Sequence, residues 1–265
     1  MDLYNALNIK YNTKELIALV GAGGKTTTMF ELANECANNG ERVLVTTTTA
    51  IYYPDNQDVD SIILLDKDKF NPANVKKGTI TVIGESVSPE DKLLGIDPLL
   101  VDKIYESNYF DTILVEADGA KRRLIKAPAS YEPVYPRDTT KVIGLVGLDA
   151  VGKILNEKYV HRTGIFSQVT NTKEDEEITI HTVSNLISSP NGTFKGSKNH
   201  WEKYLILNKG DNKELQDIGL SIVKLLKPQG FQIEGILITS FQNNFILKCL
   251  WFKDKNKWGH ITWNI

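Results

Sequence analysis

A glycine-rich segment near the start of the chain limits the folds that this sequence can adopt. The apolar run Leu16–Val20 passes directly into residues 21–26, Gly-Ala-Gly-Gly-Lys-Thr, and a segment with helical spacing follows at once. A strand, a glycine loop and a helix in this order are typical of a phosphate-binding loop. Glycines let backbone N–H groups approach phosphate oxygens, and the start of the helix adds the positive end of its dipole.

Two side chains of this loop suit particular parts of a nucleotide bound with Mg²⁺. Lys25 places a positive charge near the outer phosphates, and the hydroxyl of Thr26 is a ligand for Mg²⁺. The loop is shorter than the common G-x-x-x-x-G-K-[ST] pattern, because Leu19 stands where that pattern has its first glycine. A glycine-rich turn that binds no ligand is the alternative. We expect the nucleotide phosphates to contact Gly21, Ala22, Gly23, Gly24, Lys25, Thr26 and Thr27.

Composition places the chain among ordinary globular proteins. Its 265 residues are 41% hydrophobic, which is enough for one large α/β domain, and the formal net charge is −2. This balance predicts no attraction to nucleic acid or to a membrane surface. Cys36 and Cys249 form no C-x-x-C pair, so we expect neither a disulfide framework nor a cysteine-rich zinc site. No apolar run is long enough to cross a bilayer, and we therefore expect a cytoplasmic protein.

Strand and helix patterns alternate along most of the chain and predict an α/β fold. We expect strands at about 15–20, 42–45, 61–65, 79–84, 111–115, 141–148, 204–207 and 236–238. We expect helices at 25–38, from 97, near 179–188 and at 213–226, and a terminal β-hairpin formed by 245–252 and 258–265. The predicted architecture is a three-layer sandwich like that of P-loop NTPases, with a mostly parallel sheet. Residues 150–202 break the alternation, and their length favours an insertion or lid over the site within a single domain, residues 1–265.

The predicted strand at 111–115 ends in two acidic residues, Glu116 and Asp118. A carboxylate at the end of a buried strand can hold Mg²⁺ or a water bound to it. The segment Glu116–Gly119 also reads E-x-x-G, which in one branch of P-loop GTPases senses the γ-phosphate through the glycine N–H. We favour Glu116 as the metal ligand with Asp118 second, and we assign both to catalysis together with Lys25.

The predicted strand at 42–45 runs into four threonines, Thr46–Thr49. One or two of these hydroxyls, with Thr47 as the catalytic candidate, could reach Mg²⁺, the γ-phosphate or an attacking water. The alternative is a polar strand end, because β-branched residues favour an extended backbone.

Basic residues follow the two carboxylates and recur in the inserted region. Lys121, Arg122 and Lys126 lie where they could grip a phosphate or carboxylate of a second substrate. His161 and Arg162 are candidates for a direct role in the same task. The alternatives are a solvated basic face for the first group and a structural loop for the second.

The predicted strand at 204–207 ends in Asn208-Lys209-Gly210-Asp211, an N-K-x-D sequence. In GTPases the aspartate accepts hydrogen bonds from guanine N1–H and the exocyclic amine, while the asparagine and lysine brace the pocket. Adenine presents the wrong donor pattern to an aspartate. The motif therefore predicts a slight preference for GTP over ATP. The alternative is that Asp211 caps the helix that follows.

Taken together, these motifs resemble the YqeC family, accessory proteins of selenium-dependent molybdenum hydroxylases. The resemblance covers about residues 15–240 and implies a cytoplasmic maturation factor for such a hydroxylase. After His161 and Arg162 the family pattern continues with a Pro-acid pair, where this chain has Thr163 and Gly164. The segments that carry the resemblance are VGAGGKTTT at 20–28, VTTTT at 45–49, VEADGAK at 115–121, KAP at 126–128, EPV at 132–134, VGLDA at 146–150, HR at 161–162 and LNK at 207–209.

Three functional hypotheses stay open at this point. The first is an NTPase that uses Mg²⁺ with GTP or ATP to mature a selenium-dependent molybdenum hydroxylase or its cofactor. The second is an ATP-dependent ligase or kinase, because the short loop is similar to that of the much longer Mur ligases. The third is a nucleotide-gated binding protein without turnover. The expected partners are the nucleotide and the hydroxylase or a cofactor intermediate, with a homodimer as a further candidate.

Overall fold

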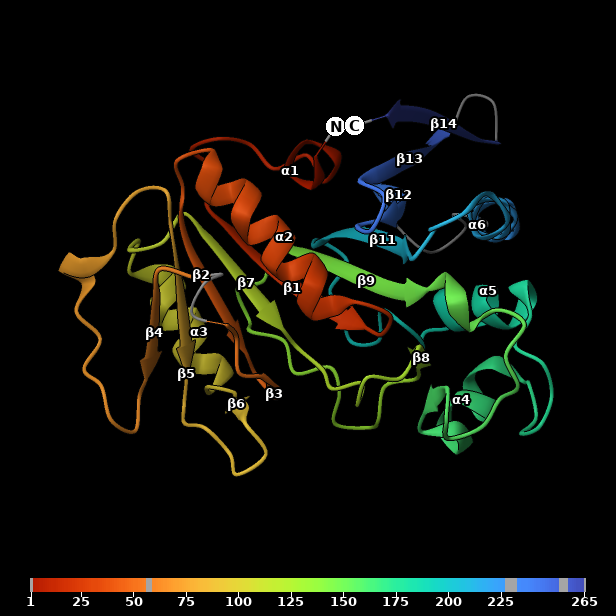
Figure 1. The fold of residues 1–265 in the computed structure, drawn as a ribbon, viewed down its shortest axis with the longest axis horizontal. Coiled ribbons are helices and arrows are strands. Elements are labelled where there is room, and N and C mark those ends of the chain that lie inside the picture. The colour runs from red at the N-terminus through yellow and green to blue at the C-terminus, as the bar shows by residue number, and fades with distance from the viewer. Residues whose placement is uncertain (1, 56–58, 227–232, 253–256, 265) are drawn as a thin grey trace.

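The computed structural model describes residues 2–55, 59–226, 233–252 and 257–264 (Figure 1). Within these residues one sheet has ten strands. Their spatial order is β14 (Lys257–Asn264), β13 (Phe245–Phe252), β12 (Gly235–Ser240), β11 (Glu202–Asn208), β9 (Lys141–Gly147), β1 (Glu15–Gly21), β7 (Thr112–Glu116), β2 (Arg42–Thr47), β5 (Thr79–Gly84) and β4 (Ser61–Leu64).

Neighbouring strands from β4 to β12 are parallel, whereas β13 and β14 form an antiparallel hairpin that extends the sheet from β12. These pairings confirm the predicted α/β fold, its mostly parallel sheet and its C-terminal hairpin. No described helix has the length and apolar character needed to cross a membrane.

Strand β1 lies inside the sheet between β7 and β9. Leu19 of β1 is in register with Glu116 of β7, and Gly21 is in register with Leu145 of β9. Residues 16–20 are fully buried, as expected of a parallel strand covered on both faces. Because parallel strands end at one edge of a sheet, the glycine loop, Glu116 and the end of β9 come together there.

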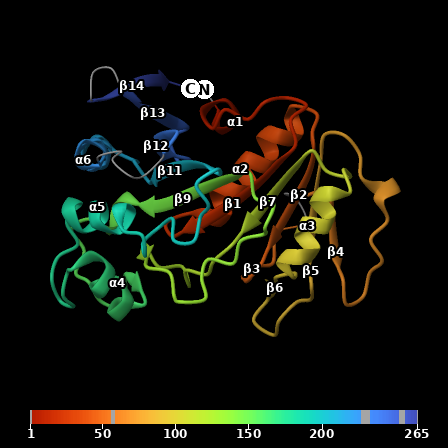
Figure 2. The ribbon, with the colours of Figure 1, turned by 180° about the vertical axis from the view of Figure 1, so that it is seen from behind.

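Helices cover both faces of the sheet (Figures 1 and 2). The longer described helices are α2 (Lys25–Asn38), α3 (Pro98–Glu106), α4 (Thr163–Thr170), α5 (Ile180–Ser188) and α6 (Lys213–Leu225). Alternate side chains of β1 point to opposite faces of the sheet. Ile17 and Leu19 pack with α2, whereas Ala18 and Val20 pack with α5 and α6. Helix α3 covers the same face as α5 and α6, over β2, β5 and β7.

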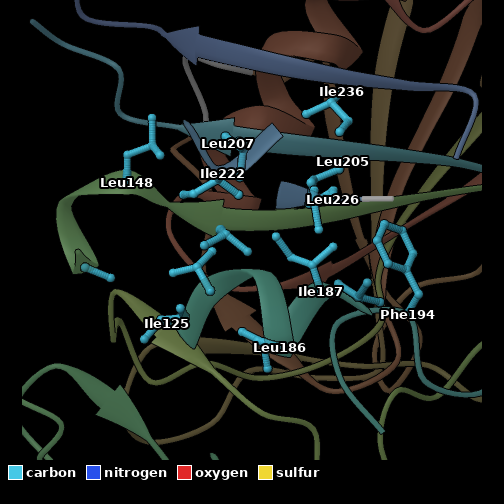
Figure 3. Close-up of a cluster of buried hydrophobic side chains, with 14 of the residues drawn as sticks. Ile125, Leu148, Leu186, Ile187, Phe194, Leu205, Leu207, Ile222, Leu226 and Ile236 are labelled. Carbon is cyan, nitrogen blue, oxygen red and sulfur yellow. The ribbon is translucent and has the colours of Figure 1, made fainter. Parts of the chain in front are cut away.

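Residues from the inserted region form part of the main core (Figure 3). Leu186 and Ile187 of α5 lie in one buried cluster with Ile222 of α6 and with Leu205 and Leu207 of β11. The segment 150–202 is therefore packed against the sheet. Its closure over a ligand stays a prediction.

Several short elements were missed by the sequence patterns. Residues 1–14 gave little signal, yet α1 (Leu3–Ala6) is capped by Asp2 and buries Leu3 and Ala6 completely. Helix α4 was also missed. A helix this short depends on packing more than on its own propensity. The remaining short elements are β3 (Ala50–Tyr52) paired with β6 (Lys92–Leu94), β8 (Ile125–Lys126) paired with β10 (Val160–His161), and the 3-10 turns η1 (Pro72–Asn74) and η2 (Leu148–Ala150).

Candidate nucleotide site

The loop between β1 and α2 has a backbone that requires glycine. Gly21, Gly23 and Gly24 have φ values of 94°, 89° and 120°, in the left-handed region that disfavours side chains. A Cβ on Gly21 would lie 2.3 Å from the carbonyl oxygen of Leu145, and one on Gly23 would lie 2.2 Å from the backbone nitrogen of Gly147. The glycines thus let the loop fold back onto the end of β9.

Lys25 is the first residue of α2 and only 4% exposed. Its ammonium donates to the carbonyl oxygen of Gly21 at 2.8 Å and pairs with Asp118 at 2.9 Å and Glu116 at 3.4 Å. Burial alone would lower the pKa of Lys25, but the two carboxylates raise it above the ordinary lysine value. In this structure the loop lysine is therefore held as a cation by carboxylates.

Glu116 and Thr26 meet across the gap between β7 and the start of α2. The hydroxyl of Thr26 donates to the carboxylate of Glu116 at 2.8 Å, and Glu116 is 6% exposed. Burial raises the pKa of Glu116, against the opposing effect of Lys25 and the Thr26 hydroxyl. Two of the three residues predicted as metal ligands therefore lie in direct contact.

Asp118 is almost completely buried and has partners on both of its carboxylate oxygens. It accepts the N–H of Gly21 at 3.0 Å and pairs with the ammonium groups of Lys25 and Lys126, each at 2.9 Å. Lys126 also donates to the carbonyl oxygen of Gly119 and to Glu132, both at 2.7 Å. The three N–H groups of Lys126 thus match three acceptors within the protein.

Glu132 belongs to this network, although the sequence analysis did not assign it to the site. It is 5% exposed and contacts Arg162 at two points, one of them an N–H···O distance of 3.0 Å. Burial would raise the pKa of Glu132, but hydrogen bonds from Arg162 and the charge of Lys126 lower it to about 2. Only the E-P-V segment of the family resemblance could have drawn attention to this residue.

Of the other predicted basic residues, His161 lies directly beside this network, whereas Arg122 contacts Tyr52. His161 is paired in register with Lys126, and burial together with the charges of Arg162 and Lys126 lowers the pKa of His161 to about 4. The guanidinium of Arg122 lies 3.7 Å above the ring centroid of Tyr52. Lys121 and Arg122 both have left-handed backbones, with φ values of 47° and 58°. Strained backbones of this kind cluster at functional sites.

The hydroxyl of Thr47 is engaged in hydrogen bonds with the backbone. It donates to the carbonyl oxygen of Glu116 at 2.7 Å and accepts the N–H of Thr49 at 3.0 Å. Thr46 and Thr48 likewise donate to backbone carbonyls. In this structure the threonine segment ties the end of β2 to the end of β7, where Glu116 lies.

The residues of the N-K-x-D sequence lie on the other side of the glycine loop, at the end of β11. Asn208 donates to the carbonyl oxygen of Gly23 at 2.9 Å and accepts the hydroxyl of Thr239 at the same distance. The hydroxyl of Ser240 donates to the carboxylate of Asp211 at 2.6 Å. The end of β12 therefore positions both the asparagine and the aspartate.

The helix-cap alternative for Asp211 is wrong. The cap of α6 is Asn212, whose side chain accepts the N–H of Leu215 at 2.9 Å. Asp211 precedes this cap by one residue, and its carboxylate accepts the hydroxyl of Ser240 on the neighbouring strand β12. Lys209 forms an ion pair of 2.7 Å with Asp149, which follows β9.

Comparison with known proteins agrees with the motifs. The model of the YqeC protein family matches residues 17–164, more than half of the 265-residue chain. The chain belongs to the YqeC family. It is 27% identical over 230 residues to the uncharacterized protein YqeC of Escherichia coli strain K12, which covers 86% of this chain and 88% of that relative. No solved structure matches. Membership confirms the resemblance seen in the sequence.

The part matched by the YqeC family model contains the glycine loop and the whole charge network. It begins inside β1 and ends at Gly164, just after Arg162, so Asp118, Lys126 and Glu132 all lie within it. Residues 208–211 lie beyond the matched part.

The residues around the glycine loop include two oxygen groups that could hold Mg²⁺ together with the phosphates of a nucleotide. No cluster of three or more His, Cys, Asp or Glu residues that could hold a metal ion occurs in the described part of the chain. The Thr26 hydroxyl and the Glu116 carboxylate are nevertheless the oxygen groups that Mg²⁺ prefers. Two protein oxygens fit a Mg²⁺ ion whose other ligands are phosphate oxygens and waters.

Proposed function

We propose that this protein binds a nucleoside triphosphate with Mg²⁺ at the glycine loop and hydrolyses it, with GTP slightly preferred over ATP. The observation that carries the proposal is the hydrogen bond of 2.8 Å between Thr26 and Glu116 at the mouth of the loop. A loop threonine beside a strand-end carboxylate is how P-loop NTPases hold their magnesium. The central strand and the helices on both faces of the sheet support a P-loop NTPase-like sandwich.

We call residues 21–26 with Glu116 and Asp118 the phosphate side of the site. Its loop supplies backbone N–H groups and the positive end of α2, both suited to phosphate oxygens. Lys25 would exchange a carboxylate partner for a phosphate oxygen when the nucleotide binds. Mg²⁺ held by Thr26 and Glu116 would neutralise charge that develops on the phosphates. Asp118 would then be free to orient an attacking water.

We call residues 208–211 with Thr239 and Ser240 the base side. Asp211 is fixed through one carboxylate oxygen by Ser240. An aspartate held in this way can accept the two donors of guanine, whereas N1 of adenine is an acceptor. Asn208 links this side to Gly23 of the loop, which supports a single ligand that spans both sides.

The basic residues beyond the phosphate side support a second, anionic substrate. Lys121 and Arg122 follow Asp118 closely in the chain, and Arg162 contacts Glu132 of the charge network. These three residues would supply cations for such a substrate, and His161 would contribute a neutral hydrogen-bonding group. From the family resemblance, we propose that the reaction serves maturation of a selenium-dependent molybdenum hydroxylase or its cofactor. A second substrate also keeps an ATP-dependent ligase or kinase as the alternative function.

The test is a binding screen followed by product analysis. Purified protein would be titrated calorimetrically with GTP, ATP and their diphosphates, with and without Mg²⁺. Free phosphate released from the preferred nucleotide supports the hydrolase. Phosphate that appears on an added acceptor supports the kinase or ligase, and nucleotide recovered unchanged supports a binding protein. Absence of nucleotide binding would contradict all three.

A further inference from the structure

A chain of alternating charges runs from the glycine loop to the start of α4. Its ion pairs measure 2.9 Å from Lys25 to Asp118, 2.9 Å from Asp118 to Lys126 and 2.7 Å from Lys126 to Glu132. The last link is the two-point contact of Glu132 with Arg162. The three central members are at most 5% exposed. Buried charges are tolerated when each has well-placed partners, so this chain has one defined arrangement.

Glu132 holds the far end of this chain. It contacts both Lys126 and Arg162, and its loop reaches the site from outside the large sheet. Whole buried ion pairs can often be replaced by apolar residues without loss of stability, so a stable fold does not by itself require charged residues at these positions. A carboxylate with a strongly lowered pKa beside a candidate active site is more typical of a functional position.

We propose that Glu132 is a positioning residue of the site, an inference that rests on the proposed function. Through Lys126 it keeps the carboxylate of Asp118 against the N–H of Gly21. Through its contact with Arg162 it fixes that guanidinium, which also donates to the hydroxyl of Tyr131 at 3.2 Å. One carboxylate therefore orients a group on the phosphate side and a group on the second-substrate side.

This role matters when the nucleotide arrives. Lys25 then turns to the phosphates, and Asp118 keeps the Gly21 N–H and the ammonium of Lys126. Lys126 stays in place because Glu132 and the carbonyl oxygen of Gly119 hold its other two N–H groups. Without the charge of Glu132, Lys126 would shift toward Asp118, and Arg162 would lose its two-point ionic contact, because a glutamine offers one acceptor oxygen in place of two. Turnover should suffer while nucleotide affinity stays nearly unchanged, because Glu132 does not touch the loop.

The experiment compares Glu132→Gln and Glu132→Asp with a matched control, Glu41→Gln. Glu41 is also a buried carboxylate, 3% exposed, but it accepts hydroxyls from Tyr4 and Thr112 at the opposite edge of the sheet. We expect Glu132→Gln to lower kcat by about tenfold or more while the Kd for the Mg²⁺–nucleotide stays within about threefold. Glu132→Asp should restore part of kcat, and Glu41→Gln should change only the melting temperature. An unchanged kcat in folded Glu132→Gln would overturn the inference.

A second measurement needs no nucleotide. Hydrogen exchange and rotation of the Arg162 guanidinium can be followed by NMR, with Arg162→Lys used to assign its signal. We expect slow exchange in the wild type and fast exchange in Glu132→Gln. Equal exchange in both proteins would overturn the inference even if turnover changed. If the wild type neither binds nor hydrolyses nucleotide, the proposed function fails, but this measurement still decides whether Glu132 holds Arg162.

Discussion

The phosphate side and the base side of the site are held together by different forces. On the phosphate side Lys25, Glu116 and Asp118 are all at most 6% exposed and neutralise one another. On the base side Asn208 and Asp211 are fixed by the hydroxyls of Thr239 and Ser240. In the proposed nucleotide complex the first arrangement would have to change partners, whereas the second could keep its bonds.

Because of this difference, substitutions on the two sides should have different effects on stability and on ligand binding. Buried ion pairs couple stability to function, because removal of one partner leaves an uncompensated charge in the interior. Hydrogen bonds between neutral hydroxyls and polar side chains cost about 1 kcal/mol each when they are lost. Substitutions on the phosphate side should therefore affect folding as well as binding or turnover, and those on the base side should mainly affect nucleotide selectivity.

The largest expected effect is that of Lys25→Ala. The variant should lose about 100-fold in nucleotide affinity, since a charged hydrogen bond to phosphate disappears. It should also lose about 3–5 kcal/mol of stability, because Asp118 and Glu116 lose their shared cation. Urea unfolding and titration calorimetry would measure both. The double variant Lys25→Ala with Asp118→Asn should regain stability but not affinity, and a single variant as stable as the wild type would contradict this coupling.

Acid should weaken the charged network through Glu132. The folded state lowers the pKa of this carboxyl from 4.5 to about 2, so its stabilisation is complete above pH 4.5 and is lost as the pH falls toward 2. The shift corresponds to about 3 kcal/mol at most. The difference in unfolding free energy between the wild type and Glu132→Gln should shrink between pH 7 and pH 3 in urea titrations. If the difference in unfolding free energy between the two proteins stayed constant with pH, the negative charge of Glu132 would not be the source of the stabilisation.

Removal of the strand-end charges should affect turnover more than binding. Glu116→Gln and Asp118→Asn keep the shape of each side chain and remove its negative charge. We expect losses of about 10- to 100-fold in kcat and smaller changes in Kd. Single-turnover phosphate release would measure the first, and calorimetry the second. Wild-type rates in both variants would remove the carboxylates from the reaction.

The smallest effects should come from the base side. GTP should bind about tenfold better than ATP, the lower end of the range for one charged hydrogen-bonding group. Asp211→Asn should shift the preference toward xanthine nucleotide, whose extra carbonyl needs a donor. Ser240→Ala should weaken GTP binding only by several-fold and leave the melting temperature almost unchanged, because it frees Asp211 without removing it. Equal affinities for GTP and ATP, unaltered in Asp211→Asn, would contradict guanine recognition.

The sequence by itself determined the core elements and the position of the glycine loop among them. The helix at 25–38 and the strand at 79–84 have the predicted bounds, because apolar period and cap residues are local properties. The proximity of Gly21–Thr26 to Glu116 could be predicted because neighbouring parallel strands end at the same edge of a sheet. The nucleotide itself stays a prediction.

Only the tertiary structure decided which charges meet. Lys126 and Arg162 are 36 positions apart in number, yet one carboxylate from the loop at 127–137 joins them. Glu132 lies in the E-P-V segment of the family resemblance, but its partners could not be recognised from the sequence, because they depend on long-range packing of an irregular segment. The same holds for Ser240, which holds Asp211 from the neighbouring strand β12. Periodicity and motifs describe the elements of a chain, whereas the partners of a buried charge depend on how those elements pack.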